Sequence, residues 1–316
     1  MARKRKQTIT QQIMHDVIAT QKERSHDLSR KQYIRDAKRF VKYCREHFDS
    51  KTFGDCRAHI QDYSDFMQKS GYKASTIHTY LAGVCAVFGV DLGDISKPIR
   101  HVADYTRGRG GAKSVDNLSD PKWSYIVDFQ RAVGIRRDEL YRLKGKDIET
   151  DESGYLCVVV RRGKGGKRQL QRIDGSNENF IAEYFSKVAP DEFVFDRKLF
   201  NNDLNFHAIR AECARKYYFE QVQRLGSDTD YVRKLESEIR ARWNRFNLQR
   251  NGKARPIPQN EISGQYFLRG KTREFAINKG LSTSYNKLAL LATSIFKLSH
   301  WRNDVTVGSY MLISHN

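Results

Sequence analysis

Residues 150–173 read TDESGYLCVVVRRGKGGKRQLQRI and give the clearest β-strand signal in the chain. Two runs of strand-forming residues, 155–162 and 169–173, flank the glycine-rich stretch 163–166. Short strands on either side of such a turn predict a β-hairpin. Lys164 then lies at a flexible tip, from which its side chain can reach down onto a bound partner.

On the N-terminal side of this hairpin, apolar residues recur at helical spacing. Three predicted helices carry Ile34, Ala37, Phe40, Val41, Cys44 and Phe48, then Ile60, Tyr63, Phe66 and Met67, then Ile77, Tyr80, Leu81, Val84, Cys85 and Phe88. Ser75 is the predicted N-cap of the third helix. We expect an all-α domain of about four or five helices over residues 10–92, preceded by a basic flexible arm at residues 1–9.

The periodicity stops at residues 93–116, where the stretch TRGRGGAKS predicts an interdomain linker. Residues 117–316 form a second domain, in which helices surround the hairpin. Within it, residues 224–284 are polar and poorly periodic around RNGKARPIPQN, which predicts an inserted helix followed by an irregular excursion. The expected fold class is therefore mainly α, with a helical N-terminal domain and a mostly helical second domain that holds a small antiparallel β-sheet.

The net charge of +20, with a pI near 9.7, makes a polyanion the leading partner. Charge alone does not separate DNA from RNA or from a membrane surface. The basic residues are spread along the whole chain, which argues against a membrane, and no apolar run is long enough to span one. The five cysteines are scattered without metal-ligand spacing, so neither disulfides nor a zinc site is expected.

Several basic residues stand where they can meet a phosphate. Arg136 follows a glycine break in GIRRDELYRLKGKDI and precedes Glu139 by three residues. In FHAIRAE, His207 and Arg210 are three apart and share one helical face. Taken singly, such residues are more often structural or solvated than catalytic.

Their order along the chain is more specific. LSHWRNDVTVGSYML adds His300 and Tyr310, so the series runs Arg136, Lys164, His207 with Arg210, His300 and Tyr310. This order resembles the active site of the tyrosine recombinase (phage integrase) family, and residues 10–92 look like that family's core-binding domain. The resemblance implies that Tyr310 is the nucleophile and that the other five residues are catalytic. Two assignments have close alternatives, because Arg137 adjoins Arg136 and Lys167 shares the hairpin with Lys164.

The chemistry explains why these residue types occur together. When a tyrosine oxygen attacks a phosphodiester, two guanidinium groups can bind the charge that builds on the non-bridging oxygens, in place of a metal ion. Lys164 can protonate the leaving 5′ oxygen, and the histidines can orient the phosphate or assist proton transfer at Tyr310. No cofactor and no metal is expected.

The expected function is site-specific recombination of double-stranded DNA through a covalent 3′-phosphotyrosine. The expected partner is DNA with a specific recombination site, on which monomers assemble to a tetramer, with an accessory DNA-bending protein as a further candidate and no membrane. A cytoplasmic protein of a prokaryote, a phage or a mobile element fits this function. The alternatives are a type IB topoisomerase and a non-catalytic DNA-binding regulator. The sequence departs from the family pattern in two places: the interval 224–284 is long, and only six residues follow Tyr310. The short tail leaves open how protomers exchange contacts.

Overall fold

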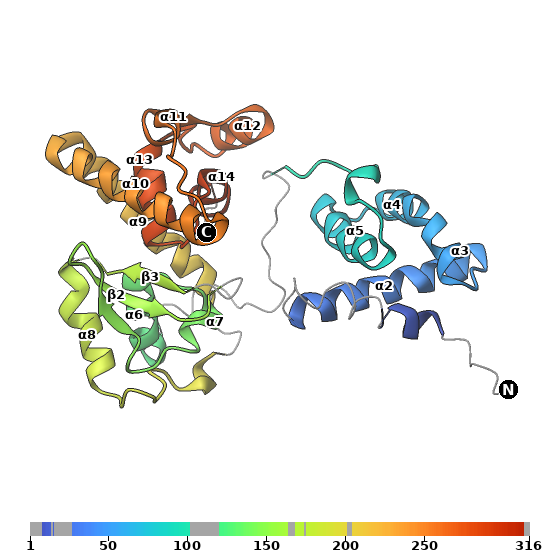
Figure 1. Cartoon of the computed structure of the whole chain (residues 1–316), viewed down its shortest axis with the longest axis horizontal. Helices are drawn as coiled ribbons and strands as arrows, with labels where there is room; N and C mark the ends of the chain where they lie inside the picture. The colour runs from blue at the N-terminus through green and yellow to red at the C-terminus, as the bar shows by residue number, and fades with distance from the viewer. Residues whose placement is uncertain are drawn as a thin grey trace. The chain divides into compact units, whose positions relative to one another are not determined.

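The computed structural model describes residues 8–13, 15, 27–101, 120–163, 168–173, 175–200 and 204–312. It divides into two compact units, Met1–Thr106 and Arg107–Asn316 (Figure 1). Both are mainly α-helical, and the second holds a small antiparallel sheet, so the expected fold class is confirmed. Most of the expected arm, most of the expected linker and Lys164 lie outside the described residues. None of the described helices is both long and apolar enough to cross a membrane.

The first unit is built on the predicted apolar helix faces. Its helices are α2 (Asp27–Phe48), α3 (Phe53–Ala58), α4 (Ile60–Lys69) and α5 (Ala74–Phe88), followed by the 3-10 turn η1 (Leu92–Asp94). The ring of Phe40 packs against Tyr63 and Phe88, with both centroid distances 5.2 Å. Helices α2 and α5 approach closely at Gly83, where an added Cβ would lie 2.8 Å from Oδ2 of Asp36.

Two details of this unit differ from expectation. Ser75 is not the N-cap of α5, because the helix begins two residues earlier than expected, at Ala74, and its N-cap is Lys73, which makes no side-chain cap bond. The unit also extends beyond the expected domain end at residue 92. Ile95 is buried in the core, and the Ser96 N–H donates to Oε1 of Gln61 at 2.9 Å. Apolar burial and this bond hold the first part of the expected linker on the unit.

The predicted hairpin is present in the second unit as part of a three-stranded antiparallel sheet. The strands are β1 (Ile148–Thr150), β2 (Leu156–Val160) and β3 (Gln169–Arg172), in the order β1-β2-β3. Val158 pairs with Ile148 on one side and with Gln171 on the other. Both hairpin strands are shorter than the predicted runs, and the strand β1 was not predicted.

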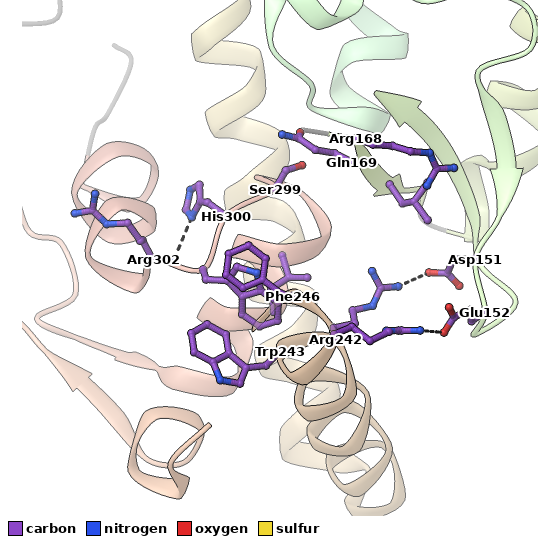
Figure 2. Close-up of a pocket in the computed structure, with 14 residues that line it drawn as sticks. Asp151, Glu152, Arg168, Gln169, Arg242, Trp243, Phe246, Ser299, His300 and Arg302 are labelled. Atoms are coloured by element: carbon purple, nitrogen blue, oxygen red, sulfur yellow. Dashed lines mark hydrogen bonds and ion pairs between the residues drawn. The ribbon is translucent and has the colours of Figure 1, made fainter. Parts of the chain in front are cut away.

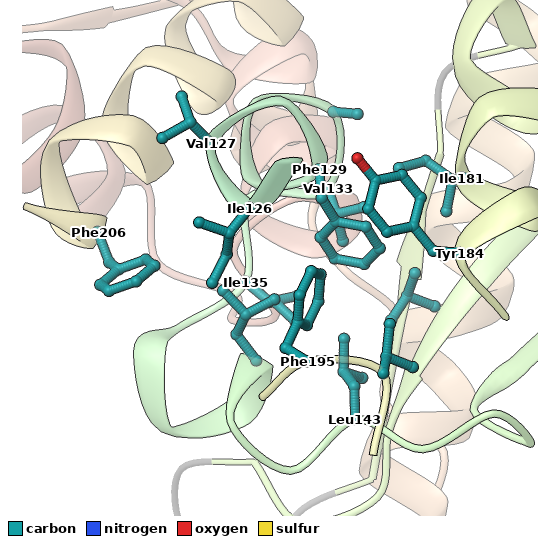
Figure 3. Packing of buried hydrophobic residues seen from close by; sticks show 14 of the residues in the cluster. Ile126, Val127, Phe129, Val133, Ile135, Leu143, Ile181, Tyr184, Phe195 and Phe206 are labelled. Atoms are coloured by element: carbon teal, nitrogen blue, oxygen red, sulfur yellow. The ribbon is translucent and has the colours of Figure 1, made fainter. Parts of the chain in front are cut away.

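One face of the sheet belongs to the first of two cores in this unit. Around it lie α6 (Ser124–Val133), α7 (Arg137–Leu140) and α8 (Glu178–Ser186). Phe129 lies within this core with its ring centroid 5.1 Å from Tyr184 and 4.9 Å from Phe195 (Figure 3). This packing fixes α6, and the turn that follows it carries the first candidate arginine.

The second core lies in the C-terminal half of the unit. The elements of this half are α9 (Phe206–Ser227), α10 (Thr229–Asn251), α11 (Gln259–Ile262), β4 (Gln265–Phe267), α12 (Gly270–Asn278), β5 (Ser284–Asn286), α13 (Lys287–Phe296), α14 (Asn303–Thr306) and the π-helix η7 (Val307–Met311). Leu235, Ile239, Ile257 and Ile262 are buried in this core against α9 and α13. The segment 224–284 therefore supplies part of the core, and after α10 it is ordered into two helices and a strand pair rather than an irregular excursion.

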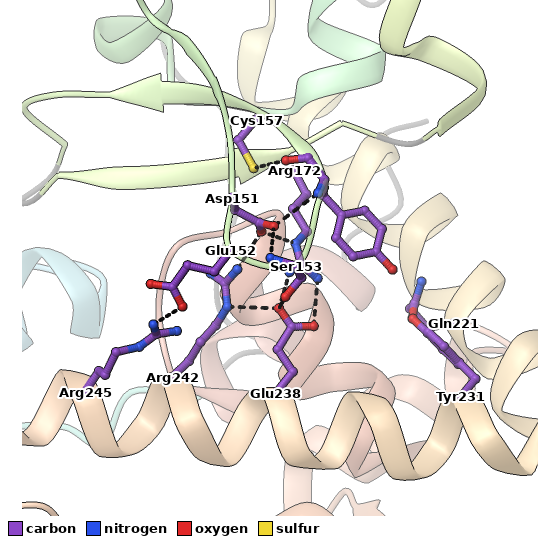
Figure 4. A network of polar contacts seen from close by, with 11 residues as sticks. Asp151, Glu152, Ser153, Cys157, Arg172, Gln221, Tyr231, Glu238, Arg242 and Arg245 are labelled. Atoms are coloured by element: carbon purple, nitrogen blue, oxygen red, sulfur yellow. Dashed lines mark hydrogen bonds and ion pairs between the residues drawn. The ribbon is translucent and has the colours of Figure 1, made fainter.

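A buried ionic network ties α10 to the sheet (Figure 4). Arg172 of β3 donates to Oδ2 of Asp151 at 2.7 Å and is paired with Glu238 of α10. Arg242, one turn along α10, donates to the same Asp151 oxygen at 2.7 Å. Burial raises the pKa of Asp151, but hydrogen bonding and the charge of Arg172 outweigh it and the pKa is lowered. The carboxylate is thus ionised and bridges one arginine of β3 and one of α10.

Candidate active site

The turn between α6 and α7 presents Arg136. Helix α6 ends at Gly134, whose φ of 70° is in the left-handed region that favours glycine. An added Cβ there would lie 2.7 Å from Sγ of Cys213, so the turn is also closely packed. Arg136 is the N-cap of α7, and Glu139 accepts from its backbone N–H at 2.8 Å and from its guanidinium at 2.6 Å. The buried Glu139 therefore orients Arg136 through both ends of the residue.

The carbonyls at and just after the end of α6 are held by four side chains, three of which come from distant segments. The carbonyls of residues 132–135 accept in turn from Lys297 Nζ at 3.3 Å, Gln171 Nε2 at 3.0 Å, the Arg210 guanidinium and Gln130 Nε2. A helix end leaves such carbonyls without intrahelical partners, and burial makes unpaired carbonyls costly. We call these four side chains the turn clamp. They fix the segment immediately before Arg136.

Arg210 connects this turn to the candidate nucleophile. It lies on α9, is 2% exposed, and donates from Nη2 to the Leu298 carbonyl at 3.0 Å. Arg136 donates from its own Nη2 to the same carbonyl at 3.4 Å. Arg210 Nε lies 3.4 Å from Oη of Tyr310 and donates to it. The two guanidinium groups thus converge on one oxygen, and one of them contacts the tyrosine hydroxyl.

Tyr310 lies in the π-helix η7 and is buried. π-helical turns are rare and often occur at functional sites. The carbonyl of Tyr310 accepts from Nη1 of Arg215 at 3.0 Å, so α9 holds both the side chain and the backbone of this residue.

Both predicted histidines lie near Tyr310. The ring centroid of His207 is 5.4 Å from that of Tyr310, and the centroid of His300 is 6.5 Å from it. His300 follows Ser299, whose φ of 56° turns the chain sharply after α13. Its Nδ1 accepts from the Arg302 N–H at 3.3 Å, and its Nε2 is buried without a partner among the described residues.

The charge state of His300 follows from its surroundings. Burial, followed by the charges of Arg210, Arg136 and Arg302, lowers the pKa of His300 to about 3. The imidazole is therefore neutral at neutral pH and can accept a hydrogen bond, whereas burial and the three arginines oppose its protonation. It also lines a groove of about 650 Å³ on the side of α10 (Figure 2).

Five of the six predicted site residues are thus brought together from segments far apart in the chain, and the sixth, Lys164, lies outside the described residues. The structure also separates the neighbouring arginines. Arg137 donates to the carbonyl of Phe200, whereas Arg136 reaches Leu298 beside Arg210. Lys167 is not among the described residues either.

Sequence reasoning missed Lys297, Gln171 and Arg215. Lys297 is fully buried, and its Nζ donates to the Arg172 carbonyl at 2.7 Å as well as to residue 132. Its signal in the sequence was a single lysine at the end of the apolar run LALLATSIFKL. Gln171 and Arg215 stood in polar surroundings, where no sequence pattern distinguished them.

No family model and no curated protein matches the sequence. Among solved structures, the chain is similar to a crystal structure of XerA recombinase, with 19% identity, 70% of this chain and 86% of that chain covered, and a TM-score of 0.25. It is also similar to the Tn1549 transposon integrase in complex with transposon right end DNA, with 12% identity, 96% and 95% covered, and a TM-score of 0.37. Both scores are low, and neither likeness assigns a role to a residue of this chain.

Proposed function

We propose that this chain is a tyrosine-type site-specific DNA recombinase, in which Tyr310 attacks a phosphodiester and becomes joined to the 3′ phosphate. One observation carries the proposal: Arg136 and Arg210 both donate to the Leu298 carbonyl, and Arg210 also contacts Oη of Tyr310. Two convergent guanidinium groups beside a tyrosine hydroxyl are suited to bind a phosphate in line with that hydroxyl.

The arginines supply the charge stabilisation in this mechanism. A non-bridging phosphate oxygen takes the place that the Leu298 carbonyl now holds between Arg136 and Arg210. Negative charge develops on that oxygen as the new bond forms, so donors already in position lower the barrier. Glu139 orients Arg136, and the bond to the Gly134 carbonyl orients Arg210, before the DNA arrives.

The proton transfers balance within the site. Tyr310 Oη forms a bond to phosphorus and releases its proton to water, while the bond to the 5′ oxygen breaks and that oxygen takes a proton from Lys164. His207 orients the phosphate. Reversal of these steps by an incoming 5′ hydroxyl rejoins the strands. The expected partner is duplex DNA with a specific site, on which four copies assemble.

The test is a Tyr310→Phe variant on nicked duplexes taken from the DNA that flanks the gene. Phenylalanine keeps the ring and its packing while removing the attacking oxygen, so the variant should bind DNA but form no covalent adduct. Tyr184→Phe is the matched control, because it also removes one hydroxyl from a buried tyrosine of the same unit. Arg136→Ala should block the reaction with Tyr310 intact.

Mass spectrometry of the DNA-linked peptide then identifies the attacking residue. An adduct on another tyrosine, or one that persists in Tyr310→Phe, refutes the assignment. Relaxation of a supercoiled plasmid without exchange between two sites would instead favour a type IB topoisomerase activity.

A further inference from the structure

The groove beside His300 has the composition of a site for an unpaired nucleotide (Figure 2). We propose that it binds one unstacked base of a single-stranded DNA segment, an inference that rests on the proposed function. Its walls come from the start of β3, the loop after β1, the C-terminal part of α10 and the segment that follows α13. Its volume of about 650 Å³ is that of a small-ligand pocket.

Three aromatic rings form one side of the groove. Trp243 and Phe246 are on α10, and Trp301 follows His300 in the chain. The ring centroid of Trp301 is 5.0 Å from Trp243 and 5.9 Å from Phe246. All three side chains are half-buried, so part of each ring remains accessible within an open groove. Bases of any sequence stack on such rings, because every base has a π-face.

Arginines surround these rings. Arg168, Arg245 and Arg302 line the groove with roughly half or more of each side chain exposed. Each is paired with a carboxylate at the surface, and such exposed pairs contribute little stability. A strand phosphate can therefore engage these guanidinium groups at little cost. Aromatic faces among arginines are the combination that single-stranded nucleic acid requires.

The groove also contains polar atoms that lack a partner. Trp243 Nε1, Gln169 Oε1 and His300 Nε2 are buried without a hydrogen bond to any residue that the structure describes. Buried polar atoms are normally satisfied, and such exceptions call for a partner. The edge of a base offers both acceptors and donors, so a bound base that displaces one of these side chains can supply its missing hydrogen bond. Paired bases in a duplex have these edges occupied.

The position of His300 links the groove to strand cutting. His300 lines the groove and lies 6.5 Å from Tyr310 between ring centroids. A strand held at Tyr310 therefore has its neighbouring nucleotides beside the groove. Exchange of strands requires these nucleotides to leave one duplex before they pair in another. A base that stacks in the groove would hold the strand in this unpaired state.

The test uses the full-length protein and a single-stranded oligonucleotide of about 12 nucleotides that carries 2-aminopurine, whose fluorescence is quenched by stacking. Phe246→Leu keeps an apolar side chain but removes the π-face, and should weaken binding roughly tenfold and abolish the quenching. Phe219→Leu is the matched control, because Phe219 is 59% exposed on α9 and is not among the residues that line the groove. This control should bind and quench as the wild type does.

A second measurement compares the same oligonucleotide with one that carries an abasic site at the probe position. The wild type should bind the abasic strand more weakly, and Phe246→Leu should not distinguish the two. Equal affinity of the wild type for both strands, or equal behaviour of Phe246→Leu and wild type, would overturn the inference.

The binding test of the groove and the adduct test of Tyr310 can fail independently of each other. A wild-type adduct at Tyr310 together with an unaffected Phe246→Leu variant refutes the groove alone. Base-dependent binding without any adduct refutes the recombinase activity and leaves a single-strand site.

Discussion

The lowered pKa of His300 makes a quantitative prediction about stability. In the folded protein, burial and the charges of three arginines lower this pKa to about 3, whereas the ordinary value is 6.5. Below pH 6.5 the unfolded chain therefore binds a proton that the folded chain does not. Protonation of His300 therefore favours the unfolded chain, and the free energy of unfolding falls progressively as the pH drops from 6.5 toward about 3.

The size of the effect follows from the two pKa values. Each pH unit in this window costs about 1.4 kcal/mol, so at about pH 5 the loss from His300 is about 2 kcal/mol. His300→Gln removes the titrating group. The free energy of unfolding of the wild type should therefore fall by about 2 kcal/mol more than that of the variant between about pH 7 and about pH 5.

Urea titrations followed by tryptophan fluorescence measure this difference. All three tryptophans, Trp123, Trp243 and Trp301, lie in the second unit, so the signal reports its unfolding alone. His59→Gln changes a histidine of the first unit and should leave this transition unchanged. If His300→Gln and the wild type lost the same free energy on acidification, His300 would not be buried among the arginines as described.

Three further predictions concern the turn and the DNA. Gly134→Ala should lower the free energy of unfolding by about 1–2 kcal/mol from its positive φ alone, more with the contact to Cys213; Cys213→Ala should restore part of the loss in the double variant, and no recovery would contradict the close packing. Duplex binding should weaken linearly in a plot of log K against log salt, with a slope of about −0.9 per phosphate contact; a flat plot would exclude phosphate-dominated binding by this chain of net charge +20. Cleavage should persist in EDTA, because Arg136, Arg210 and Lys164 supply the charge and the proton; loss of cleavage with chelator would contradict this chemistry.

Local patterns predicted those parts of the fold that depend on local sequence. The run of three valines before a glycine-rich turn predicted the hairpin, and helical periodicity predicted the first unit. The role of residues 224–284 was not predictable in this way. Leu235 and Ile239 form only a narrow apolar stripe on the highly charged α10, and its arginines pair with carboxylates from the loop after β1. Such pairing between distant segments leaves no periodic signal in the sequence.

In the candidate site, too, local spacing was predictable and contacts between distant segments were not. The spacing of three between His207 and Arg210 placed both on one helix face. No spacing could predict that the Leu298 carbonyl would receive two guanidinium groups. Lys297 was overlooked because lysine is almost never fully buried, and an apolar run that ends in lysine usually ends at the surface.

The turn clamp also makes the assembly of the candidate site a late event in the synthesis of the chain. Its side chains come from positions 130, 171, 210 and 297, so the segment before Arg136 is completed only after nearly the whole chain has been synthesised and folded. A nascent chain on the ribosome, or a fragment that ends before Lys297, carries Arg136 without this support. The arrangement in which Arg136 and Arg210 share the Leu298 carbonyl should therefore form only in the nearly full-length chain.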